Sequence, residues 1–142
     1  MAITKTGSAE WQGSLKDGTG TVSTGSGALA SQPYGFNTRF EGRPGTNPEE
    51  LIGAAHASCF AMAFSMVLGQ SNLTPSKIES QATITLSEVE GGFAVTKSHL
   101  VVTAVVPGAD EAQVREAAEG AKANCPISKL LNAEITMDLT VG

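Results

Sequence analysis

The sequence predicts an α+β fold in which helices pack against an antiparallel sheet. Apolar and polar residues alternate through residues 78–86 and 133–141, as in half-buried strands. A long apolar stretch, 52–68, directly follows helix-start signals. The predicted elements run in the order strands, helix, hairpin, helix and strand, which differs from the regular alternation of a wound βαβ fold. With 142 residues the chain is expected to form one domain, 1–142.

The N-terminal part is rich in Gly, Thr and Ser and contains few large apolar residues up to Leu29. This composition predicts strands separated by turns, such as Lys16-Asp17-Gly18. Residues 34–41 fit a further strand, which Gly42-Arg43-Pro44-Gly45 ends.

The strongest helix signal begins at Asn47, a favourable N-cap that is followed by a proline and two glutamates. The helix is expected to cover residues 48–68, with Gly69 as its C-cap. Because it is apolar on every side, it should be buried on every side. Two arrangements satisfy this. Either the helix lies wholly inside one domain, or a sheet covers one side and a second subunit covers the other.

The rest of the chain predicts a hairpin, two helices and a closing strand. After Pro75 the expected elements are strands at 78–86 and 93–106 joined at Glu90-Gly91-Gly92, a helix capped by Asp110 and ending near Asn124, a short helix at 126–131, and a strand at 133–141. The inward residues of the longer helix should be Val114, Ala117, Ala118 and Ala121.

Charge and composition exclude several functional classes. The net charge is −5, with a pI of about 4.9, which argues against a surface for nucleic acid or anionic lipid. The N-terminus lacks the apolar region of a secretory signal, and the run 52–68 is short for a bilayer span. A cytoplasmic protein without membrane contact is therefore expected. Two cysteines and two histidines are too few for a disulfide scaffold or an evident zinc set, and cytoplasmic thiols should be free.

Two cysteines are candidates for chemistry. Cys59 lies in the middle of the long helix, where the helix dipole helps little, so a reactive thiolate there needs a nearby cation. The alternative is a small buried apolar residue. His56, three residues earlier, could assist Cys59 or could pack as a core histidine. Cys125 precedes Pro126 at a helix start, where free N–H groups favour a thiolate, although it could be an incidental cap. These patterns do not assign an order to the two thiols.

Arg39 and Arg43 lie shortly before Glu49. An Arg–Glu pair there could be a surface salt bridge worth little, or a guanidinium directed at a thiolate or an oxyanion. Glu49 and Cys59 are separated by about 15 Å along their helix, so they cannot touch within one helix. If the pair serves Cys59, a helix from a second subunit must deliver it. This gives the hypothesis of an active site shared across a homodimer.

Two segments of this sequence resemble the OsmC/Ohr family of bacterial thiol peroxidases. They are Asn47-Pro48-Glu49-Glu50-Leu51-Ile52-Gly53-Ala54-Ala55-His56-Ala57-Ser58-Cys59-Phe60 and Asn124-Cys125-Pro126-Ile127-Ser128-Lys129. The segment Thr38-Arg39-Phe40-Glu41-Gly42-Arg43-Pro44-Gly45-Thr46 is similar to the OsmC branch in particular. The resemblance implies an OsmC/Ohr-like intertwined homodimer with antiparallel sheets around long central helices.

The resemblance also implies residue roles. Cys59 corresponds to the peroxidatic cysteine and Cys125 to the resolving cysteine. Arg39 is expected to stabilise the Cys59 thiolate and polarise the peroxide, with Arg43 as the fallback. Glu49 matches the glutamate that orients this arginine.

The implied reaction reduces organic hydroperoxides, and hydrogen peroxide less well, in oxidative and osmotic stress defence. Cys59 becomes a sulfenic acid, and a Cys59–Cys125 disulfide then forms. An external dithiol reductant, such as a lipoylated protein, regenerates the thiols, and no metal, haem or flavin cofactor is expected. The apolar side chains of Phe60, Met62 and Phe64 would favour organic substrates. The alternatives are a non-enzymatic stress-response or binding protein with inert cysteines, and a redox sensor that uses the same pair.

Overall fold

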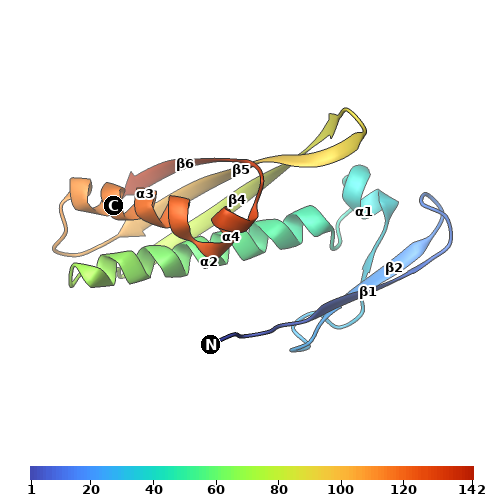
Figure 1. Cartoon of the computed structure of the whole chain (residues 1–142), viewed down its shortest axis with the longest axis horizontal. Coiled ribbons are helices and arrows are strands. Elements are labelled where there is room, and N and C mark those ends of the chain that lie inside the picture. Colours follow the sequence, from blue (N-terminus) through green and yellow to red (C-terminus); the bar gives the residue numbers. More distant parts are fainter. The chain divides into compact units, whose positions relative to one another are not determined.

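The structure, a computed structural model, describes all residues from Met1 to Gly142. The chain forms two compact units, Met1–Leu51 and Ile52–Gly142, and most of their elements are labelled in Figure 1. The description of residues 1–142 as one domain stays a prediction.

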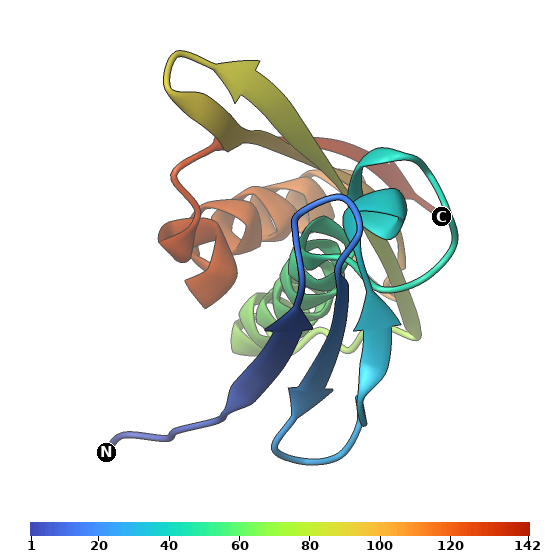
Figure 2. The ribbon, with the colours of Figure 1, turned by 90° about the vertical axis from the view of Figure 1, so that its right-hand side faces the viewer.

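The first unit contains a three-stranded antiparallel sheet in the order β1-β2-β3, seen in Figure 2. Its strands are β1 (Gly7–Gln12), β2 (Thr19–Thr24) and β3 (Gln32–Tyr34). The predicted turn between β1 and β2 is confirmed, since the Gly18 N–H donates to the Ser14 carbonyl at 2.8 Å.

A short helix, α1 (Phe36–Phe40), replaces the strand predicted at residues 34–41, which was wrong. The reason lies at its N-terminus. The Thr38 hydroxyl accepts from the Gly35 N–H and donates to the Gly35 carbonyl, both at 3.0 Å, and this closes the first turn. The rings of Phe36 and Phe40 then pack against each other one helical turn apart, tilted by 42° with centroids separated by 4.9 Å.

The long helix α2 covers Pro48–Gln70 and begins as predicted. The Asn47 side chain accepts a hydrogen bond from the Glu50 N–H at 2.8 Å, which confirms the N-cap. The predicted C-cap at Gly69 is wrong, because the helix continues through it. The left-handed residue that ends the turn is Asn72, with φ 58°, and the Leu73 N–H returns to the Leu68 carbonyl at 3.0 Å.

One face of α2 is buried, and the opposite face is not. The buried residues recur every three or four positions: Gly53, His56, Phe60, Phe64 and Leu68. On the other side, Met62 is 77% exposed and Met66 is 62% exposed. Within the second unit the helix is therefore not buried on every side, as an arrangement wholly inside one domain would require. An apolar face is left for another surface to cover.

The length and apolar composition of α2 would also allow it to cross a membrane. The helix is longer than the run of residues 52–68 on which the expectation of no membrane contact was based. The same signature is typical of a core helix. The buried stripe of α2 packs in this way, because Phe60, Phe64 and Leu68 belong to the hydrophobic core of the second unit.

The second unit has a three-stranded sheet in the order β4-β5-β6. Strands β4 (Lys77–Val89) and β5 (Gly92–Val105) form the predicted antiparallel hairpin. Strand β6 (Glu134–Val141) runs parallel to β5, so the expectation of a wholly antiparallel sheet is wrong. Helices α3 (Glu111–Asn124) and α4 (Pro126–Leu130) lie between β5 and β6 in the chain. Together they form the crossover connection that a parallel pair of neighbouring strands requires.

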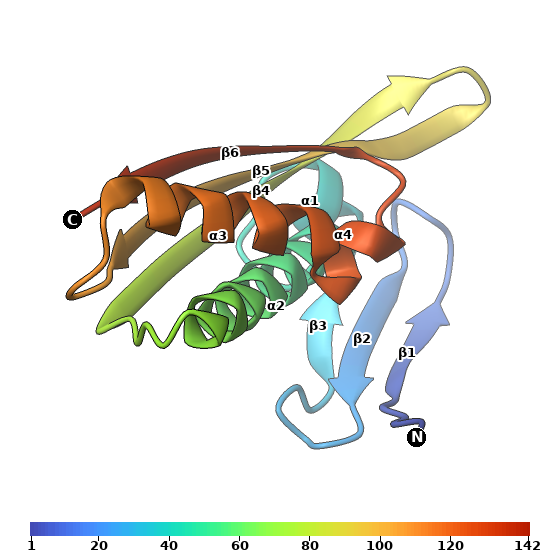
Figure 3. The ribbon, with the colours of Figure 1, turned by 60° about the vertical axis from the view of Figure 1, so that its left-hand side comes forward.

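Helices α2 and α3 lie along the same face of this sheet (Figure 3). The core between them contains alternate residues of β5 and the predicted inward residues of α3, which are confirmed: Leu100, Val102, Ala104, Val114, Ala117, Ala118 and Ala121. A Cβ at Gly53 would lie 3.1 Å from the Ala82 carbonyl oxygen, so this glycine permits α2 to approach β4 closely. The packing fixes α2, which carries Cys59, against the crossover, which carries Cys125.

Candidate active site

The fold brings the two cysteines into contact. Cys59 lies on α2 and is half-buried, whereas Cys125 lies between α3 and α4 with 1% of its surface exposed. Both are free thiols. The Cys125 side chain and the backbone N–H of Ile127 both lie close enough to the Cys59 thiol to shift its pKa. Two residues far apart in the sequence therefore form one dithiol pair.

The surroundings of Cys59 disfavour its thiolate within a single chain. Burial raises the pKa of the Cys59 thiol, and the neighbouring Cys125 raises this pKa further. The hydrogen bond from the Ile127 N–H acts in the opposite direction. None of these influences is a positive charge. The cation that a mid-helix thiolate requires is therefore absent from the groups that act on Cys59.

Cys125 is both the C-cap of α3 and the N-cap of α4. Its Sγ accepts from the backbone N–H of Ser128 at 3.4 Å, and its S–H donates to Ser128 Oγ at 3.0 Å. Pro126 occupies the first position of α4, where no N–H is needed. The prediction that a helix-start N–H would meet this sulfur is confirmed.

His56 is a fully buried core histidine with both ring nitrogens bonded. Nδ1 lies 2.6 Å from Ser98 Oγ on β5, and Nε2 lies 2.8 Å from Ser128 Oγ on α4. Burial lowers the pKa of His56, so its ring is neutral at physiological pH. The His56 ring is therefore connected to Cys125 through Ser128, which is hydrogen-bonded to both residues.

Arg39 and Glu49 form a two-pronged ion pair in the first unit. Arg39 Nε donates to Glu49 Oε1 at 2.9 Å, and Nη2 donates to Oε2 at 3.1 Å. The guanidinium also lies over the Phe40 ring, 5.3 Å from its centroid. Arg43 makes no ion pair, and its backbone N–H donates to the Asn37 carbonyl at 3.1 Å. Of the two candidate arginines, Arg39 is the one paired with Glu49.

A pocket of about 300 Å³ adjoins Arg39. Apolar and aromatic side chains make up most of its wall, and its lining residues are Trp11, Leu15, Tyr34, Gly35, Phe36, Arg39 and Phe40. Four of the seven aromatic residues of the chain are in this group. Phe60 and Phe64, which the sequence suggested as substrate-favouring side chains, are instead fully buried in the core.

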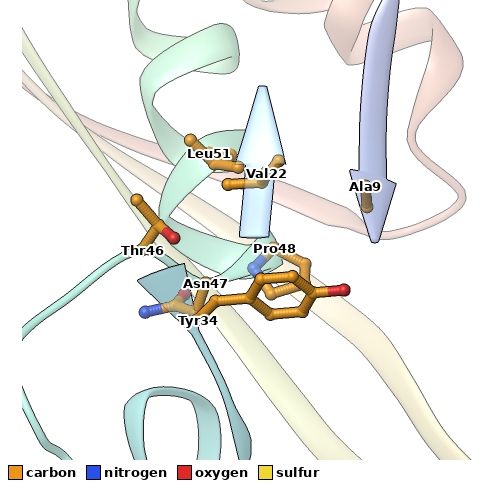
Figure 4. Close-up of a pocket in the computed structure, with 7 residues that line it drawn as sticks. All are labelled: Ala9, Val22, Tyr34, Thr46, Asn47, Pro48 and Leu51. Carbon is orange, nitrogen blue, oxygen red and sulfur yellow. The ribbon is translucent and has the colours of Figure 1, made fainter. Parts of the chain in front are cut away.

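A second pocket, of about 200 Å³, lies beside the start of α2 (Figure 4). Its lining has no charged side chain and comprises Ala9, Val22, Tyr34, Thr46, Asn47, Pro48 and Leu51. Tyr34 lines both pockets, so they are neighbours in the first unit.

Sequence reasoning found the two cysteines, Arg39 and Glu49, and left the role of His56 open. It missed Ser128 and Ser98, which bond to the histidine ring. Ser128 lies inside the Cys125-Pro126-Ile127-Ser128 segment, three residues after a capping cysteine, and this spacing is a usable signal. A buried serine on a strand, such as Ser98, carries no comparable signal. No group of three or more His, Cys, Asp or Glu side chains is arranged to hold a metal ion.

Comparison with known proteins links this arrangement to one family. Residues 40–140 match the model of the OsmC-like protein family. The chain is similar to Peroxiredoxin OsmC of Escherichia coli (strain K12), with 55% identity over 138 residues that cover 97% of this chain and 96% of the relative. It is also 31% identical over 102 residues to an organic hydroperoxide resistance protein of Xanthomonas axonopodis pv. citri, covering 71% and 70% of the two chains.

Solved structures share the fold. The organic hydroperoxide resistance protein OhrB of Bacillus subtilis aligns with a TM-score of 0.74 and 27% identity, covering 95% of this chain and 98% of the other. An OsmC-like protein of unknown function from Vibrio cholerae aligns with a TM-score of 0.75 at 18% identity, covering 98% and 100%. The predicted α+β, OsmC/Ohr-like fold class is confirmed.

Proposed function

Because the chain belongs to the OsmC-like family, we propose that it is a cysteine-based, thiol-dependent peroxidase that acts on organic hydroperoxides in stress defence. The observation that carries this proposal is the close approach of the Cys125 side chain to the Cys59 thiol. Two reduced thiols that lie side by side can convert a sulfenic acid on one of them into a disulfide.

In the proposed reaction the Cys59 thiolate attacks the distal peroxide oxygen. The alcohol leaves, and Cys59 becomes a sulfenic acid. Cys125 then attacks the Cys59 sulfur, water leaves, and a disulfide forms. The exposures of the two residues support these roles, because the half-buried Cys59 can meet a substrate and the 1%-exposed Cys125 is shielded from one.

The proposed active enzyme is a homodimer in which the Arg39–Glu49 pair of one copy serves Cys59 of the other. Two observations support this. The groups that act on the Cys59 thiol in one chain include no cation. The α2 face that carries Met62 and Met66 is apolar and exposed, so a second copy has a surface to cover. The guanidinium would lower the pKa of the Cys59 thiol and polarise the peroxide.

The aromatic pocket beside Arg39 supports organic hydroperoxides as the preferred substrates, ahead of hydrogen peroxide. An alkyl or aryl tail would bury apolar surface there, whereas hydrogen peroxide has no tail to bury. The two thiols carry the electrons, so the proposed reaction needs an external dithiol reductant, such as a lipoylated protein, and no prosthetic group. The proposed compartment is the cytoplasm, where free thiols are maintained.

The test is consumption of cumene hydroperoxide in the presence of dihydrolipoamide. Cys59→Ser should abolish turnover, because the attacking sulfur is lost. Cys125→Ser should react once and then accumulate over-oxidised Cys59 or a mixed disulfide, which intact-mass spectrometry detects. Ser58→Ala is the matched control, since this exposed neighbour of Cys59 bonds only to the Ala55 carbonyl, at 3.1 Å.

The same experiment separates the alternatives. A non-enzymatic stress-response protein would consume no peroxide in any variant. A redox sensor would form the disulfide once and would turn over no faster with the dithiol present. Full activity of Cys59→Ser would refute the proposed function.

A further inference from the structure

A continuous chain of hydrogen bonds runs from Cys125 into the core of the second unit. The Cys125 S–H donates to Ser128 Oγ at 3.0 Å, and Ser128 Oγ lies 2.8 Å from His56 Nε2. His56 Nδ1 then lies 2.6 Å from Ser98 Oγ. These four residues come from four places in the fold, the α3–α4 junction, α4, α2 and β5, so the hydrogen-bonded series is held from several sides.

The donors and acceptors of this chain have one consistent direction. Because Ser128 Oγ accepts from the Cys125 thiol, its own hydrogen is free to point at His56 Nε2. A neutral imidazole that accepts at Nε2 carries its hydrogen on Nδ1, which then donates to Ser98 Oγ. A proton can therefore pass from the Cys125 sulfur to the His56 ring while every side chain keeps its hydrogen-bond partners.

We propose that Ser128 and His56 form a proton relay that activates Cys125 as the attacking thiol in the disulfide-forming step. Ser128 touches the reacting sulfur, and His56 is the positioning residue that acts through it. This inference rests on the proposed function, because it requires a sulfenic acid on Cys59. It gives the buried histidine of α2 a part in resolution of the sulfenic acid rather than in the attack on peroxide.

The step needs no oxidant or reductant besides the two sulfur atoms. The Cys125 S–H bond breaks as its proton passes to Ser128 Oγ, while the Ser128 hydroxyl proton passes to His56 Nε2. The Cys125 thiolate attacks the Cys59 sulfenic sulfur, so an S–S bond forms and the S–O bond breaks. The departing hydroxide lies on the side of Cys59 opposite the attacking sulfur, takes a proton from solvent and leaves as water, and the proton on His56 is then released through Ser128 to solvent. Cys125 sulfur is oxidised, and Cys59 sulfur is reduced.

The backbone supports the same step. The Ser128 N–H donates to the Cys125 sulfur at 3.4 Å, which stabilises the developing thiolate without moving. The titratable groups near the relay are few. Cys59 lies beside Cys125, and Lys129 is exposed on α4. Lys97 and His99 flank Ser98 on β5, and by strand alternation their side chains point to the other face of the sheet.

The test separates the two chemical steps. The protein is mixed with a stoichiometric amount of cumene hydroperoxide and quenched at intervals with a sulfenic-acid trap and a thiol alkylating agent. Mass spectrometry then gives the rates of sulfenic acid formation on Cys59 and of disulfide formation with Cys125. Ser128→Ala should leave the first rate within about twofold and slow the second about a hundredfold at neutral pH.

A merely structural role would not produce the expected pH dependence. With the relay broken, hydroxide must deprotonate Cys125, so the deficit of Ser128→Ala should shrink as the pH is raised. Ser128→Thr keeps the hydroxyl and should recover most of the rate. His56→Gln keeps a hydrogen-bonding side chain but cannot take the proton, and it should slow the second step like Ser128→Ala.

Ser80→Ala is the matched control, because Ser80 has a buried hydroxyl without a hydrogen-bond partner. It should leave both rates as they are in the unmodified protein. A wild-type rate of disulfide formation in Ser128→Ala and His56→Gln would overturn the relay, and so would a deficit that is equal at every pH and not recovered by Ser128→Thr. If the unmodified protein forms no sulfenic acid on Cys59, the proposed function fails first, and the relay fails with it.

Discussion

Arg39 and Glu49 meet through two parallel hydrogen bonds, Nε to Oε1 at 2.9 Å and Nη2 to Oε2 at 3.1 Å. This fork geometry fixes the plane of the guanidinium, which a single contact would not do. The side chain of Arg39 is 37% exposed, whereas that of Glu49 is 14% exposed. The carboxylate is thus the anchored partner, and the guanidinium keeps an open side that can face a thiolate or a peroxide.

We expect Arg39→Ala to slow the reaction of Cys59 with organic hydroperoxide by about a hundredfold, because one preorganised positive group is lost. The pKa of the Cys59 thiol should rise for the same reason. Stopped-flow peroxide kinetics measure the first effect, and the pH dependence of Cys59 alkylation measures the second. Arg39→Lys should recover only part of the rate, since an ammonium cannot reproduce the fork.

Arg43→Ala is the matched control for this prediction. Arg43 follows α1 in the same loop region but makes no ion pair, so its loss should change the peroxide rate little. If Arg43→Ala were the slower variant, the role proposed for Arg39 would move to Arg43.

Met62→Glu should separate the proposed homodimer into monomers. A glutamate would place an unpaired charge against an apolar partner surface, at a cost of about 3 kcal/mol or more, which is roughly a hundredfold in the dissociation constant. Sedimentation velocity over a range of concentrations measures the change. Peroxidase activity should fall with the dimer, because Cys59 would lose the arginine of the second copy.

The control for Met62→Glu is Val101→Lys. Val101 is 47% exposed on the face of β5 opposite the core, and its register partner on β6 is Asp138. A lysine there meets a favourable charge and should leave the oligomeric state unchanged. An unmodified protein that is monomeric and fully active would contradict the shared site.

His56 should make the protein less stable in mild acid. Burial lowers the pKa of His56 below its ordinary value of 6.5, whereas the unfolded chain titrates near that value. Between the two pKa values the unfolded state binds the extra proton. The free energy of unfolding therefore decreases as the pH falls below 6.5, by at most about 1.4 kcal/mol per pH unit for this one group.

Urea unfolding at a series of pH values measures this dependence. His56→Gln should lower the free energy of unfolding near neutral pH and reduce its slope between pH 6.5 and the lower folded pKa. His99→Gln removes the other histidine of the chain and should leave the His56 contribution in place. An unchanged slope in His56→Gln would show that another group governs the acid sensitivity.

The sequence predicted the elements whose local signals agree with their packing. Helix α2 begins where Asn47 and Pro48 indicated, and α3 follows its Asp110 cap. Helix α1 was missed because its stability depends on the Thr38 hydroxyl bonding back to Gly35, a contact that alternation of residue types does not reveal. The direction of β6 was also missed, since an alternating strand looks the same whether it pairs parallel or antiparallel.

The site was predictable in part for a related reason. Cys59, Cys125, Arg39 and Glu49 are reactive or charged residues in recognisable motifs, so each carries a local signal. The pocket beside Arg39 was not predictable, because its aromatic wall is assembled from β1, β3 and α1 by the sheet pairing. The contact between Ser98 and His56 likewise depends on how β5 packs against α2.

The division of the chain into two units, with Arg39 in one and Cys59 in the other, has a genetic consequence. If each site combines residues from two copies, an Arg39→Ala chain and a Cys59→Ser chain are each inactive alone, yet a mixed dimer contains one complete site. Co-expression of the two alleles should therefore restore hydroperoxide resistance to a strain that lacks the protein. Cys59 and Cys125 lie in the same unit. A mixed dimer of a Cys59→Ser chain and a Cys125→Ser chain would therefore contain no complete site.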